Sequence, residues 1–438
     1  MKILMLLKIF SHGVLMKGFK TLVSAGDAVS IVLNNIDINL ESEYVDLQDS
    51  LGRHVSEDIF ARYDVPPFDR SAVDGFALRS TDVISASYNN PVELKVVGKI
   101  YAGSDVRKIP KLREGEAVKI FTGAPIPEGA DAVVMIEQAR EVGDKVYINR
   151  PVAPLQNISR RGEDLRRGDL ILRRGDKIRP WHIGILASQN IVKIPVYRKI
   201  RIGVLSTGSE LVEPGEEIDF ESGKIINSSK PMLMALIRDE GCEPIDLGTV
   251  PDDIDIIRNK ILENIDKIDM MITTGGSSVG EQDLVAESIK TIDGHKILFH
   301  GVRIRPGRPA GLAIVREKPV FMFSGFPVAA LVEFQLLIHP LIKKIYRARE
   351  DPKPLVRAKL TRRIANPPNT RSFVRVRVFE KDDKLYAEPL AITGSGILST
   401  LVKGNGILII NEDLEGYDED QEAEIELINY IFREQDLQ

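Results

Sequence analysis

Residues 200–346 alternate between short apolar runs and amphipathic stretches of helix length, and this alternation constrains the fold more than any other feature of the chain. Apolar runs at 202–205, 244–250 and 270–273 are each followed by such a stretch. This order is typical of an open, mainly parallel sheet with helices on both faces. We therefore predict a multidomain α/β protein, with a three-layer α/β domain at residues 200–350.

A glycine-rich loop, Gly-Gly-Ser-Ser-Val-Gly at 275–280, follows one of these predicted strands and leads through Asp283 into a predicted helix. Glycines let backbone N–H groups approach an anion closely, and a helix N-terminus adds a favourable dipole. The loop is not a Walker A loop, because no Gly-Lys-Ser/Thr follows, and its spacing differs from the dinucleotide-binding fingerprint. We predict an anion site at this junction, where Asp283 either caps the helix or reaches a metal ion.

Three further loops at predicted strand ends carry polar side chains, and ligands bind at strand ends in open α/β sheets. They are Ser-Thr-Gly-Ser-Glu at 206–210, Val-Pro-Asp-Asp at 250–253 and Arg-Ile-Arg-Pro-Gly-Arg-Pro at 303–309. Each alone could be an ordinary turn or helix cap, but together they offer hydroxyls, carboxylates and guanidiniums. Such a set suits a phosphorylated ligand with Mg²⁺, because hard oxygen ligands favour Mg²⁺ over zinc.

The composition excludes several classes of function. A net charge of −5 argues against broad nucleic-acid binding, which needs a basic field. The single cysteine, Cys242, excludes an internal disulfide and a thiolate metal cluster. The apolar run at 3–7 is too short to span a membrane and lacks a cleavage site. We expect a cytoplasmic protein with no nucleic-acid or membrane partner, in which residues 1–19 form a disordered N-terminal extension.

Period-two runs on both sides of the α/β domain predict β-rich regions. We predict a linking α+β domain from residues 20–60 and 168–199, a β-rich inserted module at 61–167, and a C-terminal β-barrel-like domain at 351–438. Residues 157–175 are rich in Arg, Gly and Asp, and no internal repeat is apparent. A dense loop at 67–77 places acids and a serine where they could position a reacting group or bind a metal ion.

Six motifs occur in one order along the chain. They are Phe-Asp-Arg-Ser-Ala-Val-Asp-Gly-Phe-Ala at 68–77, Thr-Gly-Ala-Pro at 122–125, Arg-Gly-Glu-Asp at 161–164, the 206–210 loop, the glycine loop through Asp283, and Pro-Gly-Arg-Pro at 306–309. This ordered set resembles that of the molybdopterin molybdotransferase family, which comprises the MoeA proteins and the corresponding domain of gephyrin. The resemblance extends over nearly the whole chain.

The resemblance implies an enzyme of molybdenum cofactor biosynthesis. Proteins of this family insert molybdate, or tungstate in some organisms, into adenylylated molybdopterin, with Mg²⁺-dependent release of AMP. They are elongated homodimers whose active site is shared between the α/β domain of one subunit and the β module of the other. Mg²⁺ is thus the implied cofactor, adenylylated molybdopterin the implied ligand, and molybdopterin adenylyltransferase a further candidate partner.

The matching motifs also imply the residues of the site. Asp74, Thr122 and Asp164 would come from one subunit, and Glu210, Asp252 and Asp283 from the α/β domain of the other, with Glu210 and Asp283 as candidate Mg²⁺ ligands. The substrate would be bound by Ser206, Thr207, Gly208, Gly275, Gly276, Ser277, Ser278 and Gly280, and by Arg303, Arg305, Pro306, Gly307, Arg308 and Pro309.

The chain departs from the family pattern at several positions. Arg308 replaces the usual lysine of Pro-Gly-Lys-Pro and keeps its charge, whereas Phe326 replaces an asparagine and removes an amide. Ser229 and Gly301 stand where the family often has asparagine and lysine. These changes leave the preference between molybdate and tungstate open.

Two alternative functions remain. Molybdopterin adenylyltransferases share the α/β fold and its glycine loop, but the additional β domains and the Asp74 loop favour the insertion enzyme. A non-catalytic scaffold of the same fold, which the gephyrin relationship allows, would not need the full set of carboxylates and arginines.

Overall fold

The structure is a computed structural model that describes residues 22–275, 283–349, 351–391 and 394–437. The predicted extension at 1–19 and the predicted ligand-binding residues Gly276, Ser277, Ser278 and Gly280 lie outside this part. The chain divides into two compact units, one of residues 1–43, 52–56 and 196–438 and the other of residues 44–51 and 57–195. No helix in the described part has both the length and the apolar character needed to cross a membrane.

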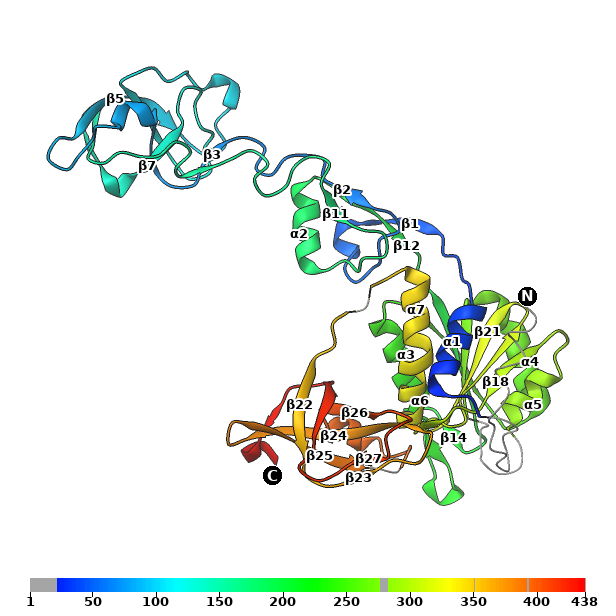
Figure 1. Cartoon of the computed structure of the whole chain (residues 1–438). Coiled ribbons are helices and arrows are strands. Elements are labelled where there is room, and N and C mark those ends of the chain that lie inside the picture. Colours follow the sequence, from blue (N-terminus) through cyan, green and yellow to red (C-terminus); the bar gives the residue numbers. More distant parts are fainter. Residues whose placement is uncertain (1–21, 276–282, 350, 392–393, 438) are drawn as a thin grey trace, which may run out of the picture. The chain divides into compact units, whose positions relative to one another are not determined.

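A six-stranded sheet lies at the centre of the first unit, in the order β16-β13-β17-β21-β20-β18 (Figure 1). β16, β13, β17 and β21 run parallel, and β20 is antiparallel to its two neighbours. The carboxyl ends of the parallel strands therefore lie along one edge. The bounds are β13 (Arg201–Thr207), β16 (Glu243–Val250), β17 (Met270–Thr274), β18 (Lys296–His300), β20 (Gly311–Val315) and β21 (Lys318–Phe323), with the short pair β14 (Leu211–Val212) and β15 (Ile225–Ile226) beside them.

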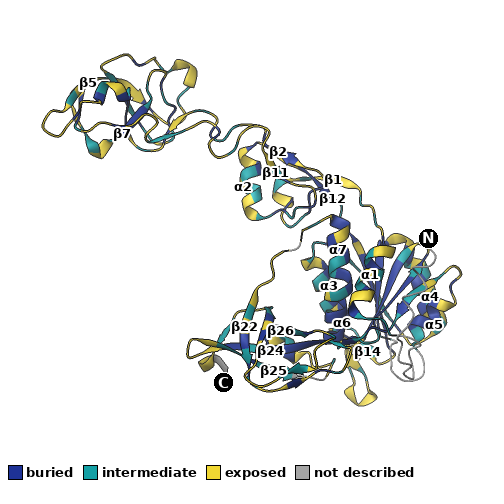
Figure 2. Ribbon diagram, viewed as in Figure 1, coloured by how far each residue is buried: buried dark blue, intermediate teal, exposed yellow. Residues whose placement is uncertain are grey.

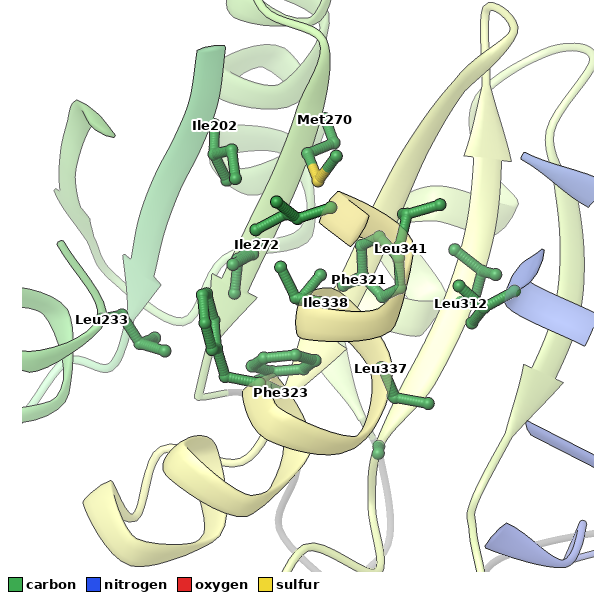
Figure 3. Packing of buried hydrophobic residues seen from close by; sticks show 14 of the residues in the cluster. Ile202, Leu233, Met270, Ile272, Leu312, Phe321, Phe323, Leu337, Ile338 and Leu341 are labelled. Carbon is green, nitrogen blue, oxygen red and sulfur yellow. The ribbon is translucent and has the colours of Figure 1, made fainter. Parts of the chain in front are cut away.

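Helices cover both faces of this sheet, so the predicted three-layer α/β domain is confirmed. On one face, side chains from α1, α3, α6 and α7 pack on Ile202, Met270, Ile272 and Phe321 (Figure 3). On the other face, α4 and α5 pack on strand residues such as Met271. Each fully buried Leu, Ile or Phe stabilises such a core by about 1.5–3 kcal/mol. The helices are α1 (Ala25–Asn35), α3 (Ser229–Asp239), α4 (Ile254–Asn264), α5 (Leu284–Lys290), α6 (Pro327–Glu333) and α7 (His339–Tyr346).

Local sequence explains where several of these helices begin and change. Asp253 caps α4 by accepting hydrogen bonds of 2.9 Å from the backbone N–H groups of Asp255 and Ile256. Helices α6 and α7 are separated by a π-helical turn, Phe334–Ile338, just before Pro340. Proline has no N–H to donate to the preceding turn, so the regular helix cannot continue there unchanged.

Helix α1 belongs to the first unit. We had predicted from the sequence that residues 20–60 form a linking domain with residues 168–199. Ala25, Ala28 and Val32 are fully buried in the core of the α/β sheet. The small apolar residues of α1 recur at helical spacing, which is typical of a helix with one buried face. That spacing carries no information about which sheet the apolar face will cover.

The C-terminal part of the first unit is a closed β-barrel, as predicted. The path β24-β25-β22-β28-β26 closes because β26 also pairs with β24. The short strand β19 (Ile304–Arg305), which comes from the α/β domain, pairs in parallel with β24. The remaining bounds are β22 (Leu355–Leu360), β23 (Ile364–Ala365), β24 (Arg371–Lys381), β25 (Lys384–Ala391), α8 (Ser399–Lys403), β26 (Gly406–Ile410), β27 (Gly416–Tyr417), β28 (Glu422–Leu427) and β29 (Phe432–Arg433).

The second unit contains the predicted β-rich module. Its six-stranded sheet has the order β7-β4-β6-β5-β9-β8, and Figure 2 shows its buried residues in dark blue. The module consists of β3 (Arg70–Ser71), β4 (Gly75–Leu78), β5 (Val92–Ile100), β6 (Glu116–Ile120), β7 (Ala132–Met135), β8 (Ala139–Val142), β9 (Lys145–Ile148) and β10 (Ile158–Ser159). Beside it lie β1 (Ser42–Asp46), β2 (Ile59–Phe60), β11 (Leu170–Leu172), α2 (Pro180–Ser188) and β12 (Lys193–Tyr197).

A turn that recurs three times connects these two parts of the second unit, a repeat that was not predicted from the sequence. Each turn has the sequence Arg-Arg-Gly followed by Glu or Asp. The backbone N–H of the first arginine donates a hydrogen bond of 2.8 Å to the side chain of that acid, three residues later. The backbone N–H of the second arginine donates a hydrogen bond of 2.8 Å to the side chain of an aspartate in the opposite segment. The pairs are Arg160–Glu163, Arg166–Asp169 and Arg173–Asp176, and Arg161–Asp69, Arg167–Asp64 and Arg174–Asp58. Glu163, Asp169 and Asp176 thus accept hydrogen bonds from the backbone of their own turns.

Candidate functional site

The carboxyl ends of β13 and β17 are joined by a buried hydroxyl network. Ser206 is fully buried, and its Oγ lies 2.9 Å from Oγ1 of Thr274 and accepts a hydrogen bond of 2.9 Å from Nδ2 of Asn227. Asn227 also donates to Oγ1 of Thr249 at 3.2 Å, which extends the network to β16. Ser206 was predicted to bind substrate directly, whereas its hydroxyl here holds the strand ends together. Asn227 was not predicted.

The same network reaches a buried lysine on α3. Oγ1 of Thr249 donates to Glu213, and Nζ of Lys230 lies 2.9 Å from carboxylate oxygens of both Glu213 and Asp246. Burial by itself lowers the pKa of Lys230, but hydrogen bonds to the two carboxylates outweigh it, and the pKa lies above its usual value. The lysine therefore stays charged and ties β14, β16 and α3 together.

The first glycine of the glycine-rich loop allows a close backbone approach. Gly275 has φ +98°, and a Cβ atom placed on it would lie 2.0 Å from the carbonyl oxygen of Thr207. Thr207 is itself buried, and its Oγ1 donates to the carbonyl oxygen of Thr274 at 3.5 Å. Gly275 and Thr207 thus bring the loops after β17 and β13 into contact, and only glycine fits there.

The predicted acids Glu210 and Asp252 lie on neighbouring loops at this edge, and both are exposed. Oδ2 of Asp252 accepts a hydrogen bond of 3.1 Å from the backbone N–H of Ser209, and Oγ of Ser209 accepts one of 3.1 Å from the N–H of Asp252. A Cβ atom on Gly208 would lie within 2.9 Å of both carboxylate oxygens of Glu210. The loops after β13 and β16 are therefore hydrogen-bonded to one another, and each carries an exposed carboxylate.

Asp283 caps α5, which is the first of the two roles that the sequence offered for it. Its Oδ1 accepts hydrogen bonds of 3.1 and 3.0 Å from the N–H groups of Val285 and Ala286. Its Oδ2 lies 2.9 Å from Nε2 of His300, at the end of β18. Both oxygens thus have partners within the protein, and His300 is a further residue that the sequence analysis did not include.

The arginine turn, Arg303 to Pro309, joins the α/β domain to the barrel. Ile304 and Arg305 form β19 against β24, and Arg371 of β24 donates a backbone hydrogen bond of 3.0 Å to the carbonyl oxygen of Arg303. Pro306, which follows a cis peptide bond, and Gly307 are buried, whereas Arg303, Arg305, Arg308 and Pro309 are partly exposed. The turn therefore holds its arginines on a rigid backbone.

Arg375 is a buried guanidinium beside this turn, and the sequence analysis missed it. It is 3% exposed, and it donates to Thr400 Oγ1 at 3.2 Å, to Phe373 O at 3.2 Å and to Gly394 O at 3.3 Å. Burial lowers the pKa of Arg375, and the positive charge of Arg305 lowers it further. These three acceptors are all neutral, so none of them compensates the charge of Arg375.

In the second unit, Asp74 and Thr122 form a close pair. Oδ1 of Asp74 accepts hydrogen bonds from the hydroxyl of Thr122 at 2.6 Å and from its backbone N–H at 2.7 Å. Hydrogen bonding, first by the hydroxyl and then by the N–H, lowers the pKa of Asp74. Asp164 lies in the same unit, where its backbone N–H donates 3.0 Å to Val65 O and its side chain is exposed.

The described carboxylates agree only in part with the predicted Mg²⁺ site. In residues 22–275, 283–349, 351–391 and 394–437, no three His, Cys, Asp or Glu side chains converge on a metal position. Mg²⁺ commonly needs only one or two protein carboxylates together with substrate phosphates. Glu210 and Asp252 meet that requirement, whereas Asp283 is engaged by its helix and His300. These two carboxylates fit a Mg²⁺ ion whose remaining ligands come from the substrate.

Comparison with known proteins covers all of these regions. Residues 23–189 match the MoeA N-terminal region (domains I and II), residues 203–344 the probable molybdopterin binding domain, and residues 357–428 the MoeA C-terminal region (domain IV). The molybdopterin molybdenumtransferase of Bacillus subtilis is 37% identical over 393 residues, which cover 89% of this chain and 90% of the relative. The corresponding Staphylococcus aureus protein is 35% identical over 393 residues, or 90% of this chain and 93% of the relative.

A solved structure agrees with the sequence matches. The molybdopterin biosynthesis moeA protein from Pyrococcus horikoshii has a TM-score of 0.80 and 36% identity, and the alignment covers 93% of this chain and 100% of that chain. With strand-end loops, arginine turn and barrel all inside the matched ranges, the chain belongs to the MoeA family of molybdenum cofactor biosynthesis.

Proposed function

We propose that this chain is a molybdopterin molybdenumtransferase that inserts molybdate or tungstate into adenylylated molybdopterin, with Mg²⁺-dependent release of AMP. The observation that carries the proposal is the concentration of positive charge at the arginine turn, where Arg305 lies close enough to the buried Arg375 for its charge to lower the pKa of that guanidinium. Arginines fixed on a rigid backbone bind tetrahedral oxyanions with several directed N–H donors. An acidic protein needs such a local concentration of positive charge to hold an anionic substrate.

The substrate phosphate would be bound at the carboxyl end of β17, in the middle of the sheet. Gly275 and Thr207 bring two strand-end loops together at the start of the glycine-rich loop, and glycines let backbone N–H groups approach an anion closely. The hydroxyl of Ser206 would act indirectly, because it is hydrogen-bonded to Asn227 and Thr274 and not presented to the substrate. These contacts keep the loops in place when ligand binds.

Glu210 would hold Mg²⁺, with Asp252 beside it and the phosphates of the substrate as the remaining ligands. When bound, the ion would neutralise charge on the phosphoanhydride that releases AMP. Asp252 fixes the loop after β13 through Ser209, so it would position Glu210 rather than react itself. Asp283 would keep α5 and His300 in place at the end of the glycine-rich loop.

We further propose a homodimer in which Asp74, Thr122 and Asp164 of one subunit complete the site of the other. A mixing experiment tests this arrangement. The variants Asp74→Asn and Glu210→Gln should each be inactive, and dimers re-formed from a mixture of the two should recover activity, because one of their two sites would be intact. No recovery from mixed dimers, once their formation is verified by mass, would contradict a shared site.

The reaction itself is tested by measuring AMP release from adenylylated molybdopterin with molybdate or tungstate, in the presence and absence of Mg²⁺. AMP release that depends on the oxyanion supports the proposal. ATP-dependent adenylylation of molybdopterin without this release would indicate the adenylyltransferase, and neither reaction would indicate a scaffold. Equal concentrations of the two oxyanions in one assay show which metal enters the cofactor.

A further inference from the structure

Glu333 is a buried carboxyl group that none of these roles uses. It ends α6 and is fully buried. Its Oε2 accepts a hydrogen bond of 2.9 Å from the backbone N–H of Ser324, the first residue after β21. Within the described part of the chain, no group is hydrogen-bonded to its Oε1, although that atom is buried as well. Leaving such an atom unpaired costs about 1–3 kcal/mol, so its presence needs an explanation.

The side chain of Glu333 also lies against the arginine turn. A Cβ atom placed on Gly307 would lie 2.9 Å from Cγ of Glu333 and 3.3 Å from its Oε1. Gly307 has φ +103°, a conformation that favours glycine. The carboxyl group therefore takes the space that a side chain at position 307 would fill. It connects the loop after β21 to the turn that carries Arg305.

The surroundings favour the neutral form of this carboxyl group. Burial raises the pKa of Glu333 well above its usual value, and the N–H of Ser324 offsets this only in part. No ion pair with Glu333 is found in the described part of the chain. The charged side chains on the elements that contact α6 or Glu333 are Arg303, Arg305 and Arg308 in the turn, Lys318 in β21, and Lys230, Arg238 and Asp239 in α3. Lys230 is paired with Glu213 and Asp246.

We propose that Glu333, as a neutral carboxylic acid, positions the arginine turn for oxyanion binding, and that its ionisation weakens this binding. The inference rests on the proposed function. A neutral acid supports Gly307 and Ser324 without attracting the guanidiniums. An ionised one would place a negative charge behind the turn, where it would compete with the oxyanion for Arg305 and repel the oxyanion directly.

The substitution Glu333→Gln tests this role, because glutamine has nearly the same shape, can still accept from Ser324 and cannot ionise. Binding of molybdate and of tungstate is measured by calorimetry on the full chain from mildly acidic to alkaline pH. We expect the affinity of the wild type to fall by about tenfold over this range, which corresponds to roughly 1.4 kcal/mol. We expect the affinity of the Gln variant to stay close to the acidic wild-type value. The exposed Glu317→Gln serves as the matched control and should behave as the wild type does.

A second measurement separates this inference from the proposed function. A carboxyl group whose pKa is raised in the folded state binds its proton more tightly there, so stability falls as pH rises from the unfolded pKa, 4.5, towards the folded one. Thermal unfolding of the wild type should show this fall, and Glu333→Gln should remove it. Hydrogen exchange at the amides of Gly307 and Arg308 should become faster at alkaline pH in the wild type only.

Failure of the proposed function and failure of the inference about Glu333 give different results. If the wild type binds no oxyanion at any pH, the proposed function is wrong, and the exchange experiment still shows whether Glu333 positions the turn. If the Gln variant has the same pH dependence as the wild type in binding, stability and exchange, Glu333 does not act as a neutral acid and the inference is overturned.

Discussion

The two proposed anion-binding regions of the first unit are built differently. The strand-end edge lies within the α/β domain, where Ser206, Thr274 and Asn227 hold the loops and Gly275 lets their backbones touch. The arginine turn is completed by a second domain, because β19 pairs with β24 and Arg375 comes from that strand. The first region therefore depends on close packing within one domain, and the second on the contact between two.

The largest effect should follow from removing the close approach at the strand-end edge. The substitution Gly275→Ala adds a Cβ atom 2.0 Å from Thr207 O at a positive φ. We expect the first unit to lose about 2–4 kcal/mol of unfolding free energy, because overpacking and backbone strain add. Calorimetric unfolding measures this loss. Gly294→Ala is the control, since Gly294 has φ +73° with nothing within 4 Å, and it should cost only about 1 kcal/mol.

A smaller effect, measured on ligand binding, is expected at the arginine turn. Lysine at position 375 keeps the charge but lacks the planar set of donors that reaches Thr400, Phe373 and Gly394. We expect Arg375→Lys to weaken tungstate binding by about ten- to a hundredfold, or roughly 1.4–2.7 kcal/mol, as measured by calorimetry. Arg377→Lys, two residues along the same strand and paired with Glu388 at 3.5 Å, is the matched control. Equal effects of both would show that the oxyanion binds elsewhere.

A single hydroxyl of the strand-end network should have a moderate effect on stability. Ser206→Ala leaves Nδ2 of Asn227 and Oγ1 of Thr274 without this partner in a buried position. We expect a loss of about 1–2 kcal/mol, measured by urea unfolding. The exposed Ser222→Ala should change stability by less than about 0.5 kcal/mol. If Ser206→Ala lost as little unfolding free energy as Ser222→Ala, the hydroxyl network would not be what holds the strand-end loops together.

The smallest effect is expected at Asp74, in the second unit. Thr122→Val removes the hydroxyl that donates to Asp74 but keeps the backbone N–H. The pKa of Asp74 should rise towards its usual value, 3.8, and NMR titration of its carboxyl group measures the change. Because a depressed pKa contributes stability above the unfolded value that is lost as pH falls, the variant should also lose less stability on acidification. An unchanged pKa would mean that the N–H alone sets it.

The strand-end region could largely be predicted from the sequence. Its residues follow apolar runs directly, so the order of strands and helices places Glu210, Asp252 and Asp283 at one edge. The sequence left two roles open for Asp283, as a cap or as a metal ligand. Only the hydrogen bonds to Val285, Ala286 and His300 show the cap, because they depend on where α5 and β18 lie.

Arg375 and Glu333 could not be recognised in the same way. Arg375 alternates with Arg377 in a strand, a pattern that indicates a solvent-facing side, and its burial results from the segment that contains Gly394 and Thr400. Glu333 ends an otherwise apolar helix segment, which predicts an exposed acid at a helix end. Its burial results from the turn at Gly307, which is distant in the sequence.

The sequence by itself thus determined the family, the α/β alternation, the barrel and the loops that face a ligand, because these depend on local apolar periods and on short ordered motifs. Only the tertiary structure decided which polar groups and which charges are paired within the protein. Burial and hydrogen-bond partners come from contacts between segments far apart in the chain, and no local pattern of residues records them.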